Sequence, residues 1–359
     1  MSYKITVGPK TNAPSFDWVL TDVFECLQKT TDYSISYFEN EEDIDESCHI
    51  AIFSKCLPKN STFRRLKATK LIFVPIDYYY STFQIWSDKT VLTLFDAIFI
   101  HNSNINTYLP VSVSKYAIDH YQKFDIKRNR TVQDFILWLG VSEYVPQTIR
   151  FLIDQKIHPD TIVLLSDTQN IIKDLNSITL QLDRLGLRSP IIGDDSNIDI
   201  QGYVIQKWSA EKQNVYLASC ISCIDYKTRE FRHLTKPPTK CQIHASSAVP
   251  QFVNEDHPAV ELLQKDGIYL KNIEDMQRME KTDIIEYGQT LKFQCDKRYH
   301  LSNVVKVYED NITQIITTPI KSRRFIFITL LSRTIRAFLF RQLSSGSKLR
   351  ELIRRITGR

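Results

Sequence analysis

Two lysines, Lys236 and Lys240, precede and open a predicted helix that ends in a turn of small residues before Pro250. The start of a helix offers unpaired backbone N–H groups and the positive end of the helix dipole, and a lysine adds a full positive charge. This combination suits a diphosphate that has to leave water. A lysine before a helix is more often a solvated charge, so the neighbouring elements must decide between the two interpretations.

The elements around these lysines follow an alternating pattern. Residues 135–140 are an apolar run that ends in Gly140, and a helical pattern over 148–157 follows. This order predicts a strand, a tight turn and a helix. Further apolar runs and helical patterns alternate from residue 161 to residue 224, which predicts a parallel sheet with helices on both faces.

Residues 236–250 resemble the donor-binding segment of two-domain glycosyltransferases that use sugar nucleotides. These enzymes have the GT-B architecture, and the group 1 glycosyltransferases are the most similar family. The segments 135–142 and 208–224 resemble two further parts of the family, so the resemblance covers about half of the chain. It implies an α/β fold class, with two Rossmann-like domains facing a cleft.

The resemblance also implies a donor site on the second domain. The glycine after the first strand would let the backbone approach the donor phosphates, and lysines would neutralise the leaving diphosphate. The donor-binding residues implied in this way are Gly140, Ser142, Arg232, Lys236, Lys240 and Pro250. No metal and no cofactor are expected, because cations of the protein would take the place of a divalent ion.

The chain departs from the family at three positions. Retaining members often carry two glutamates eight positions apart, and this chain has Thr235 and Ile243 there. The usual glycine two residues before the proline is Ala248. A group of divergent relatives has two lysines separated by three residues before the helix, and Lys236 and Lys240 match that variant.

The first part of the chain contains four apolar runs that predict buried strands, at residues 3–7, 50–54, 70–75 and 96–101. Ligands of open parallel sheets bind at the carboxyl ends of the strands. His101 and Asp77 are therefore the candidates, by position, for a general base that takes the proton of an acceptor hydroxyl. A histidine at a strand end is more often a structural residue.

At 359 residues the chain exceeds the size at which one core usually splits. The boundaries we predict are an acceptor domain at 1–126, a donor domain with its closing helix at 127–319, and a tail at 320–359. The basic segment 125–130 is the predicted linker.

Seven cysteines without a framework spacing favour a reducing compartment. Cys220 and Cys223 form a lone pair of the Cys-x-x-Cys type inside an apolar run, which favours buried thiols over a zinc site. The N-terminus lacks the apolar core of a secretory signal, and no stretch reaches ~20 apolar residues. These features predict a cytoplasmic protein.

Positive charge is concentrated at the C-terminus. Residues 320–359 contain eleven Lys or Arg and one acidic residue, a net charge of +10, whereas the whole chain carries +5. Apolar residues recur at helical spacing in two stretches on either side of residues 344–347. Two short, basic, amphipathic helices are typical of proteins that bind an anionic membrane surface.

The cations expected at the headgroups are Arg323, Arg324, Arg333, Arg336, Arg354 and Arg355. Packing on the protein itself and binding of nucleic acid are the alternatives. Proteins that bind single strands place aromatic residues between cations for stacking, whereas the tail phenylalanines lie in apolar runs. We therefore expect lipid rather than nucleic acid as the partner.

The sequence as a whole predicts a glycosyltransferase of the hexosyl type, attached peripherally to the membrane. It would move a sugar from a nucleotide-sugar donor to a glycan or a lipid-linked acceptor, as in polysaccharide biosynthesis. The alternative is a non-catalytic GT-B-like subunit or scaffold that assists an active transferase. A nicotinamide-dependent enzyme is disfavoured, because no Gly-x-Gly-x-x-Gly follows a strand.

Overall fold

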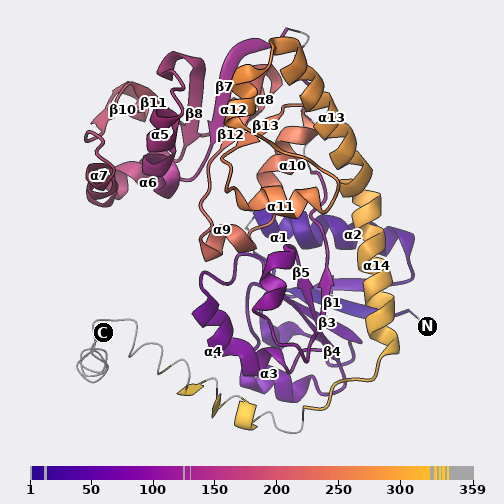
Figure 1. The fold of residues 1–359 in the computed structure, drawn as a ribbon. Coiled ribbons are helices and arrows are strands. Elements are labelled where there is room, and N and C mark those ends of the chain that lie inside the picture. The colour runs from indigo at the N-terminus through magenta and orange to yellow at the C-terminus, as the bar shows by residue number, and fades with distance from the viewer. Residues whose placement is uncertain are drawn as a thin grey trace. The chain divides into compact units, whose positions relative to one another are not determined.

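The computed structural model divides the chain into two compact units (Figure 1). Unit 1 comprises residues 1–121, 230–237 and 301–359, and unit 2 comprises residues 122–229 and 238–300. The structure describes residues 2–11, 14–123, 126–129, 131–323, 327–329, 331–332, 334–335 and 338. Within those residues, none of the helices has the length and apolar character needed to cross a bilayer.

Unit 1 is built on a six-stranded parallel sheet in the order β2-β1-β3-β4-β5-β6. The strands are β1 (Lys4–Gly8), β2 (Ser34–Tyr37), β3 (Ile50–Ser54), β4 (Lys70–Val74), β5 (Ala97–Ile100) and β6 (Ser114–Ala117). The longer helices are α2 (Asp22–Thr30), α3 (Asn60–Arg65), α4 (Thr82–Leu92) and α14 (Leu301–Thr317). Shorter helical turns are α1 (Pro14–Phe16), η1 (Asp17–Thr21), η2 (Glu41–Asp43), η3 (Ser103–Thr107) and α9 (Phe231–Thr235).

The four strands predicted for this unit are present, but two more were missed. β2 and β6 are the edge strands of the sheet, and their side chains are half-buried or exposed, whereas those of β3, β4 and β5 are all buried. An edge strand covers little apolar surface, so it leaves no continuous apolar run in the sequence.

Unit 2 has an eight-stranded sheet in the order β14-β13-β12-β7-β8-β11-β10-β9, parallel except for β9 and β10. The strands are β7 (Gln133–Leu139), β8 (Ile162–Ser166), β9 (Ile191–Ile192), β10 (Ile198–Ile200), β11 (Tyr203–Lys207), β12 (Cys220–Asp225), β13 (Gln251–Val253) and β14 (Lys271–Asn272). The α-helices are α5 (Val145–Asp154), α6 (Thr168–Lys173), α7 (Leu175–Arg184), α8 (Ala210–Ser219), α10 (Thr239–Ser246), α11 (Pro258–Gln264), α12 (Ile273–Arg278) and α13 (Lys281–Tyr299). Three 3-10 turns accompany them, η4 (Ser142–Tyr144), η5 (Pro159–Thr161) and η6 (Asp194–Ser196).

The six consecutive parallel strands of unit 2 follow the Rossmann order, since β11, β8 and β7 lie on one side and β12, β13 and β14 on the other. The chain reverses its direction across the sheet between β7 and β12. In open α/β sheets, such a reversal marks the position at which ligands bind, beside the carboxyl ends of the two strands. Cys220 and Cys223 are buried free thiols of β12, as predicted.

The closing helix corrects the predicted domain boundaries. We expected the helical pattern over 299–316 to complete the second domain, but α14 belongs to unit 1. The apolar face of α14 packs on unit 1 through Tyr308, whose ring centroid lies 5.6 Å from that of Phe24 and 5.5 Å from that of Phe99. The Tyr308 hydroxyl donates to the Val19 carbonyl at 3.1 Å. α13 is the helix that closes unit 2.

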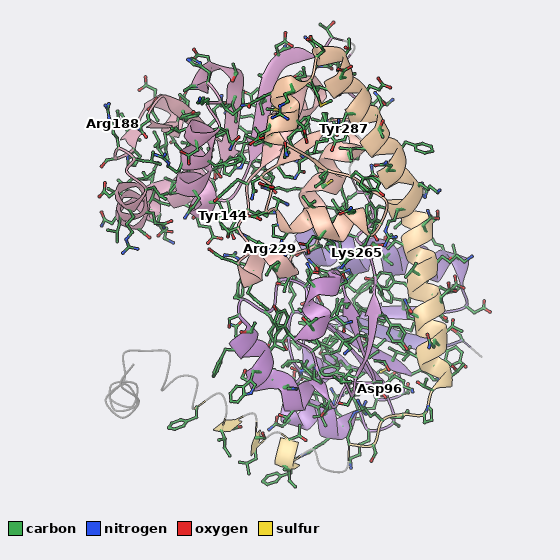
Figure 2. The ribbon with its side chains drawn as sticks, in the orientation of Figure 1. Asp96, Tyr144, Arg188, Arg229, Lys265 and Tyr287 are labelled. Carbon is green, nitrogen blue, oxygen red and sulfur yellow. The ribbon has the colours of Figure 1, made fainter. Side chains whose placement is uncertain are left out.

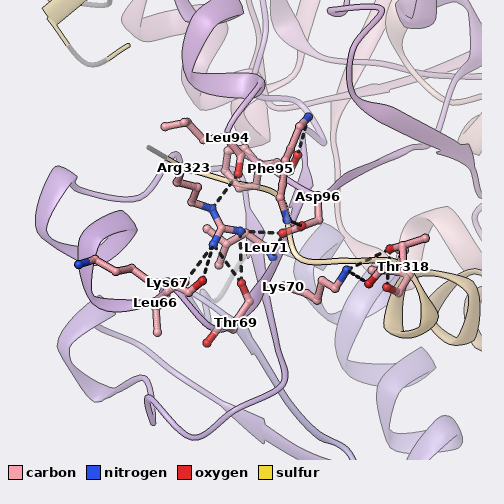
Figure 3. A network of polar contacts seen from close by, with 12 residues as sticks. Leu66, Lys67, Thr69, Lys70, Leu71, Leu94, Phe95, Asp96, Thr318 and Arg323 are labelled. Carbon is pink, nitrogen blue, oxygen red and sulfur yellow. Dashed lines mark hydrogen bonds and ion pairs between the residues drawn. The ribbon is translucent and has the colours of Figure 1, made fainter. Parts of the chain in front are cut away.

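Arg323 was predicted to meet lipid headgroups, and the structure contradicts this. Its side chain is 4% exposed and forms an ion pair with the equally buried Asp96 at 2.7 Å (Figure 3). The guanidinium also donates to the carbonyls of Leu66, Thr69 and Leu94. A buried guanidinium needs a carboxylate and several acceptors, and Asp96 before β5 supplies the charge. The other predicted headgroup ligands, Arg324, Arg333, Arg336, Arg354 and Arg355, lie outside the described residues.

Substitution of Asp96 by Asn tests this anchor. The Arg323 charge would stay buried without its carboxylate, which costs about 3–5 kcal/mol for a broken buried pair. We therefore expect the free energy of unfolding in urea to fall by that amount. Asp45→Asn, on an exposed side chain of the same unit, is the control and should leave stability nearly unchanged. Equal stability of the two variants would contradict the anchoring role.

Candidate functional site

The carboxyl ends of β7 and β12 bring together segments of unit 2 that are far apart in the sequence. Gly140 and η4 follow β7, and residues 226–229 follow β12, the strand next to β7 in the sheet. Figure 2 shows Tyr144 and Arg229 on these two segments. Because parallel strands end at one edge of a sheet, both segments reach the edge at which open α/β sheets bind ligands.

The last residue of β12, Asp225, is the centre of a charged cluster. Its carboxylate pairs with the Lys240 ammonium of α10 at 2.8 Å and with the Lys227 ammonium at 3.1 Å. The Asp225 side chain is only 2% exposed, whereas Lys240 and Lys227 keep 30% and 15% of their exposure. One carboxylate cannot neutralise two ammonium groups, so the cluster retains positive charge that solvent can reach.

His257, which precedes α11, completes this cluster. Its Nδ1 accepts a hydrogen bond from the Ala259 amide at 3.1 Å, so the proton of the neutral ring is on Nε2, which donates to Asp225 at 3.2 Å. Burial lowers the pKa of His257, although its bond to Asp225 acts in the opposite direction. The His257 ring is therefore neutral. It donates a hydrogen bond that orients the Asp225 carboxylate, and it adds no positive charge to the cluster.

The ionisation of Asp225 depends on these neighbours. Burial alone would raise the pKa of the Asp225 carboxyl, but Lys227, Lys240 and His257 outweigh burial and hold the pKa well below its usual range. Burial lowers the pKa of Lys240, and Asp225 counteracts that shift. The cationic neighbours thus keep Asp225 ionised, and Asp225 in turn partly offsets the effect of burial on Lys240.

The structure brings two of the predicted donor residues, Gly140 and Lys240, to the same indole ring. The Lys240 ammonium lies over the Trp138 ring, 5.7 Å from its centroid. A β-carbon on Gly140 would come within 2.0 Å of that ring, so any side chain here would displace the indole. Gly140 therefore has a packing role, and its amide donates to the Leu165 carbonyl at 3.1 Å. Ser142 begins η4 two residues later.

Pro250 is buried in the turn that leads from α10 to β13, together with Ala248. Ala248 has φ +54°, the left-handed conformation for which glycine, the family's usual residue here, is preferred. Arg128 fixes this turn by donating to the Ala248 carbonyl at 2.5 Å. α13 approaches it at Gly288, where a β-carbon would lie 2.2 Å from the same carbonyl oxygen. The structure thus gives Pro250 a packing role.

A cavity of about 550 Å³ adjoins the cluster in unit 2. Its lining shares Lys227 with the cluster and includes Arg229 and the rings of Phe151 and Tyr226, which stack at 4.6 Å between centroids. Asn254 holds Lys227 in place through two hydrogen bonds of 2.9 Å to its backbone. The volume is within the range of small-molecule sites, and the lining combines aromatic, cationic and amide groups.

Arg232 and Lys236 belong to the other unit. Residues 230–237, which contain α9, group with unit 1. There the Arg232 guanidinium lies over the Tyr80 ring at 5.2 Å, and Asn102 donates to the Lys236 carbonyl at 2.6 Å. Four of the six predicted donor residues therefore share unit 2, and these two do not.

His101 directly follows β5 of unit 1 and packs against His120, with 4.6 Å between the ring centroids. Both ring nitrogens of His101 are buried without a close hydrogen bond, and burial lowers its pKa to about 4. The ring is thus neutral at neutral pH. Asp77 is exposed after β4 with φ +49°. The structure places both residues at the carboxyl edge of the sheet.

Asp225, Lys227 and His257 were not predicted from the sequence. A signal for Asp225 was available, since a single acidic residue that ends an apolar strand stands where ligands of parallel sheets bind. No local signal connects it with His257, which lies 32 residues further along the chain. Within the part of the chain that the structure describes, no three His, Cys, Asp or Glu side chains are grouped as metal ligands.

No protein-family model matches the chain, and no curated protein matches its sequence. Several solved structures are similar. Anabaena HepE (Alr3699), in complex with UDP and glucose, aligns with a TM-score of 0.57 at 9% identity over 88% of this chain and 100% of that chain. A glycosyltransferase from Rickettsia africae gives 0.52 at 9% identity, covering 89% and 100%. AviGT4, a glycosyltransferase involved in avilamycin A biosynthesis, gives 0.50 at 10% identity, covering 88% and 98%.

Similarity at this level of identity shows the fold. The chain has the two Rossmann-like units of the GT-B glycosyltransferases, which confirms the fold class that the resemblance implied.

Replacing Asp225 by Asn keeps the shape of the side chain and removes its charge. Two partly buried ammonium groups would lose their carboxylate, and because Lys240 remains 30% exposed we expect the lower end of the cost of a broken buried pair, about 3 kcal/mol. Unfolding in urea at pH 7 measures the loss.

The pKa of the Asp225 carboxyl is lowered by folding. The contribution of the Asp225 carboxylate to the free energy of unfolding should therefore be complete above the ordinary aspartate pKa. It should disappear only as the pH falls through the lower pKa that Asp225 has in the folded state. The deficit of the variant should be the same at pH 7 and pH 5. Asp160→Asn, on a side chain 90% exposed, is the control. A deficit below about 1 kcal/mol, the value of a surface pair, would contradict the role of Asp225.

Proposed function

We propose that the protein is a glycosyltransferase of the hexosyl type that needs no metal ion. It takes a nucleotide-sugar donor and transfers the sugar to a glycan or a lipid-linked acceptor at an anionic membrane surface. The observation that carries the proposal is the pair of cations, Lys240 and Lys227, held by one buried carboxylate at the switch point of a Rossmann sheet. Two of the solved structures of similar fold, AviGT4 and the Rickettsia africae protein, are glycosyltransferases by name, and HepE was solved with UDP and glucose.

The chemistry of the cluster fits the donor. As the bond between the sugar and the diphosphate breaks, negative charge develops on the leaving oxygen, and cations that are already in place stabilise it without reorganisation. The excess positive charge on Lys240 and Lys227 supplies this stabilisation. The neighbouring cavity offers the Phe151 and Tyr226 rings for a nucleobase, and the carboxylates of Glu255 and Asp256 for ribose hydroxyls.

His101 is the group that we propose for the acceptor. In a direct displacement, the acceptor oxygen bonds to the anomeric carbon, the bond to the diphosphate breaks, and a ring nitrogen takes the hydroxyl proton. The His101 imidazole is neutral at neutral pH and can therefore accept a proton, and it follows a strand at the carboxyl edge of the sheet, where open sheets bind ligands. Asp77 is the alternative base, in a more exposed position.

A non-catalytic subunit is the second candidate, favoured by the two positions at which the family has glutamates. The Thr235 hydroxyl donates to the Phe231 carbonyl within α9, and Ile243 packs against the apolar cluster of unit 2. Neither position offers a carboxylate for the donor. The two candidates differ in whether the protein turns over a sugar nucleotide. Sugar release or transfer with UDP-, GDP- or CDP-linked sugars would support the enzyme.

We predict that Lys240→Ala weakens the binding of UDP, GDP or CDP, whichever binds the unmodified protein. The lost hydrogen bond between charged groups is worth roughly 1.5–3 kcal/mol, so the dissociation constant should rise about tenfold to 150-fold. Titration calorimetry measures it, and near-ultraviolet circular dichroism checks the fold. Lys240→Arg, which keeps the charge, should retain most of the affinity, and Lys265→Ala on the exposed end of α11 should retain all of it. Unchanged affinity of Lys240→Ala would refute the donor site.

We also predict that the tail binds anionic vesicles. Replacing Arg333, Arg336, Arg354 and Arg355 by Gln in the full chain removes four cations, each worth ~1 kcal/mol near the surface. Sedimentation with phosphatidylserine vesicles at low salt should therefore fall at least tenfold, and it should also fall as salt screens the remaining charge. The control variant has the same net charge as the tail variant, because it replaces four exposed cations of unit 2 by Gln. These are Lys156, Arg184, Arg188 and Lys265. Equal loss in both variants would show that net charge, not the tail, governs binding.

A further inference from the structure

The root of the tail is fixed on unit 1. The Lys70 ammonium donates to the Thr318 hydroxyl at 3.0 Å, and the Lys321 amide donates to Asp96 at 2.8 Å. The Lys321 ammonium donates to the Ser112 carbonyl at 3.0 Å, and Arg323 is buried beside it. Residues 318–323 thus lie along the edge at which β4 and β5 begin (Figure 3). The basic tail therefore leaves unit 1 from a defined place.

The described tail residues continue beside α4. The Thr90 hydroxyl of α4 donates to the Thr329 carbonyl at 3.4 Å, and Figure 1 shows this part of the chain at the end of unit 1 that carries α3 and α4. Five large apolar side chains here are 49–65% exposed. They are Phe327, Ile328, Leu331, Ile335 and Phe338. Their spacing in the sequence is that of one face of an α-helix.

α4 adds its own exposed aromatic surface next to this stripe. Trp86 lies one helical turn before Thr90 and is 44% exposed, and the Phe83 ring lies 5.0 Å from it. Lys89 is exposed three residues after Trp86, on the same side of the helix. The one acidic residue of α4, Asp88, is buried at 7% exposure. This side of α4 therefore combines aromatic rings with a cation and exposes no carboxylate.

We infer that this side of α4, with Trp86 at its centre, belongs to the surface that contacts an anionic phospholipid membrane. Tryptophan prefers the boundary between the headgroups and the acyl chains, because its ring is apolar and its N–H is polar. Lys89 would meet headgroup phosphates, and the apolar stripe of the tail would extend the contact. The inference rests on the proposed membrane attachment and adds a folded helix to it, which fixes the side of unit 1 that faces the lipid.

Fluorescence quenching by brominated lipid tests this surface in the full chain. Trp86 and Trp208 are exposed to a similar degree, at 44% and 47%, but Trp208 belongs to unit 2, whereas Trp18 and Trp138 are buried. Vesicles of phosphatidylserine and phosphatidylcholine with bromines on the acyl chains should quench the unmodified protein. Trp86→Phe should lose most of that quenching, and Trp208→Phe should retain it. Vesicles of phosphatidylcholine alone should bind less.

A second variant measures affinity. Trp86→Ala should weaken sedimentation with the same vesicles about tenfold, from the lost burial of part of an aromatic side chain, while Trp208→Ala should not. The role of α4 would be overturned if Trp86→Ala sedimented normally and if Trp86→Phe and Trp208→Phe were quenched to the same extent. The tail would then be the membrane attachment. Absence of vesicle binding by the unmodified protein would overturn both. A dimer that buries Trp86 in solution without lipid would identify the surface as a contact between copies.

Discussion

A carboxylate that leaves water must be matched by cations, and the edge of unit 2 is arranged around this requirement. Asp225 ends a buried strand, where it would not stay ionised alone. Lys227 lies two residues further along the chain, Lys240 reaches the carboxylate from α10, and His257 donates to it from the start of α11. The segment after β12, the helix before β13 and the segment after β13 are thus tied to one carboxylate. Their fixed position gives the edge its positive charge.

A buried carboxylate is matched by cations a second time in unit 1, at the end of the sheet where its strands begin. Asp96 precedes β5 and accepts from the Leu71 amide, the Lys321 amide and the Arg323 guanidinium. This buried carboxylate holds a segment more than 200 residues away in the sequence. Cations of the protein thus serve two purposes. Those held with solvent access can bind an anion, and one held without access only fixes the chain.

The degree of exposure separates these two purposes. Lys240 keeps 30% of its side chain exposed beside its carboxylate, whereas Arg323 keeps 4%. A cation that remains partly hydrated loses little when a phosphate replaces its water, and it gains a charged hydrogen bond. A cation without hydration has no place left for a ligand. Composition counts both residues equally, and for that reason charge alone could not distinguish a lipid-binding arginine from a structural one.

The sequence by itself determined the elements whose side chains are buried on both faces. Apolar runs in the sequence predict β3, β4 and β5, and a glycine at the end of such a run predicts the turn at Gly140. A parallel sheet with helices on both faces followed from the order of these elements, whereas the two-domain GT-B fold class was implied by the resemblance to the group 1 glycosyltransferases. The edge strands β2 and β6 are half-exposed, and their sequences contain no continuous apolar run that would predict a strand. Tertiary structure alone decided that α14 packs on unit 1, that residues 230–237 join it, and that Lys240 shares Asp225 with Lys227 and His257. Ion pairs form between atoms that approach in space, and their energy depends on distance and burial, neither of which is encoded in the spacing of residues along the chain.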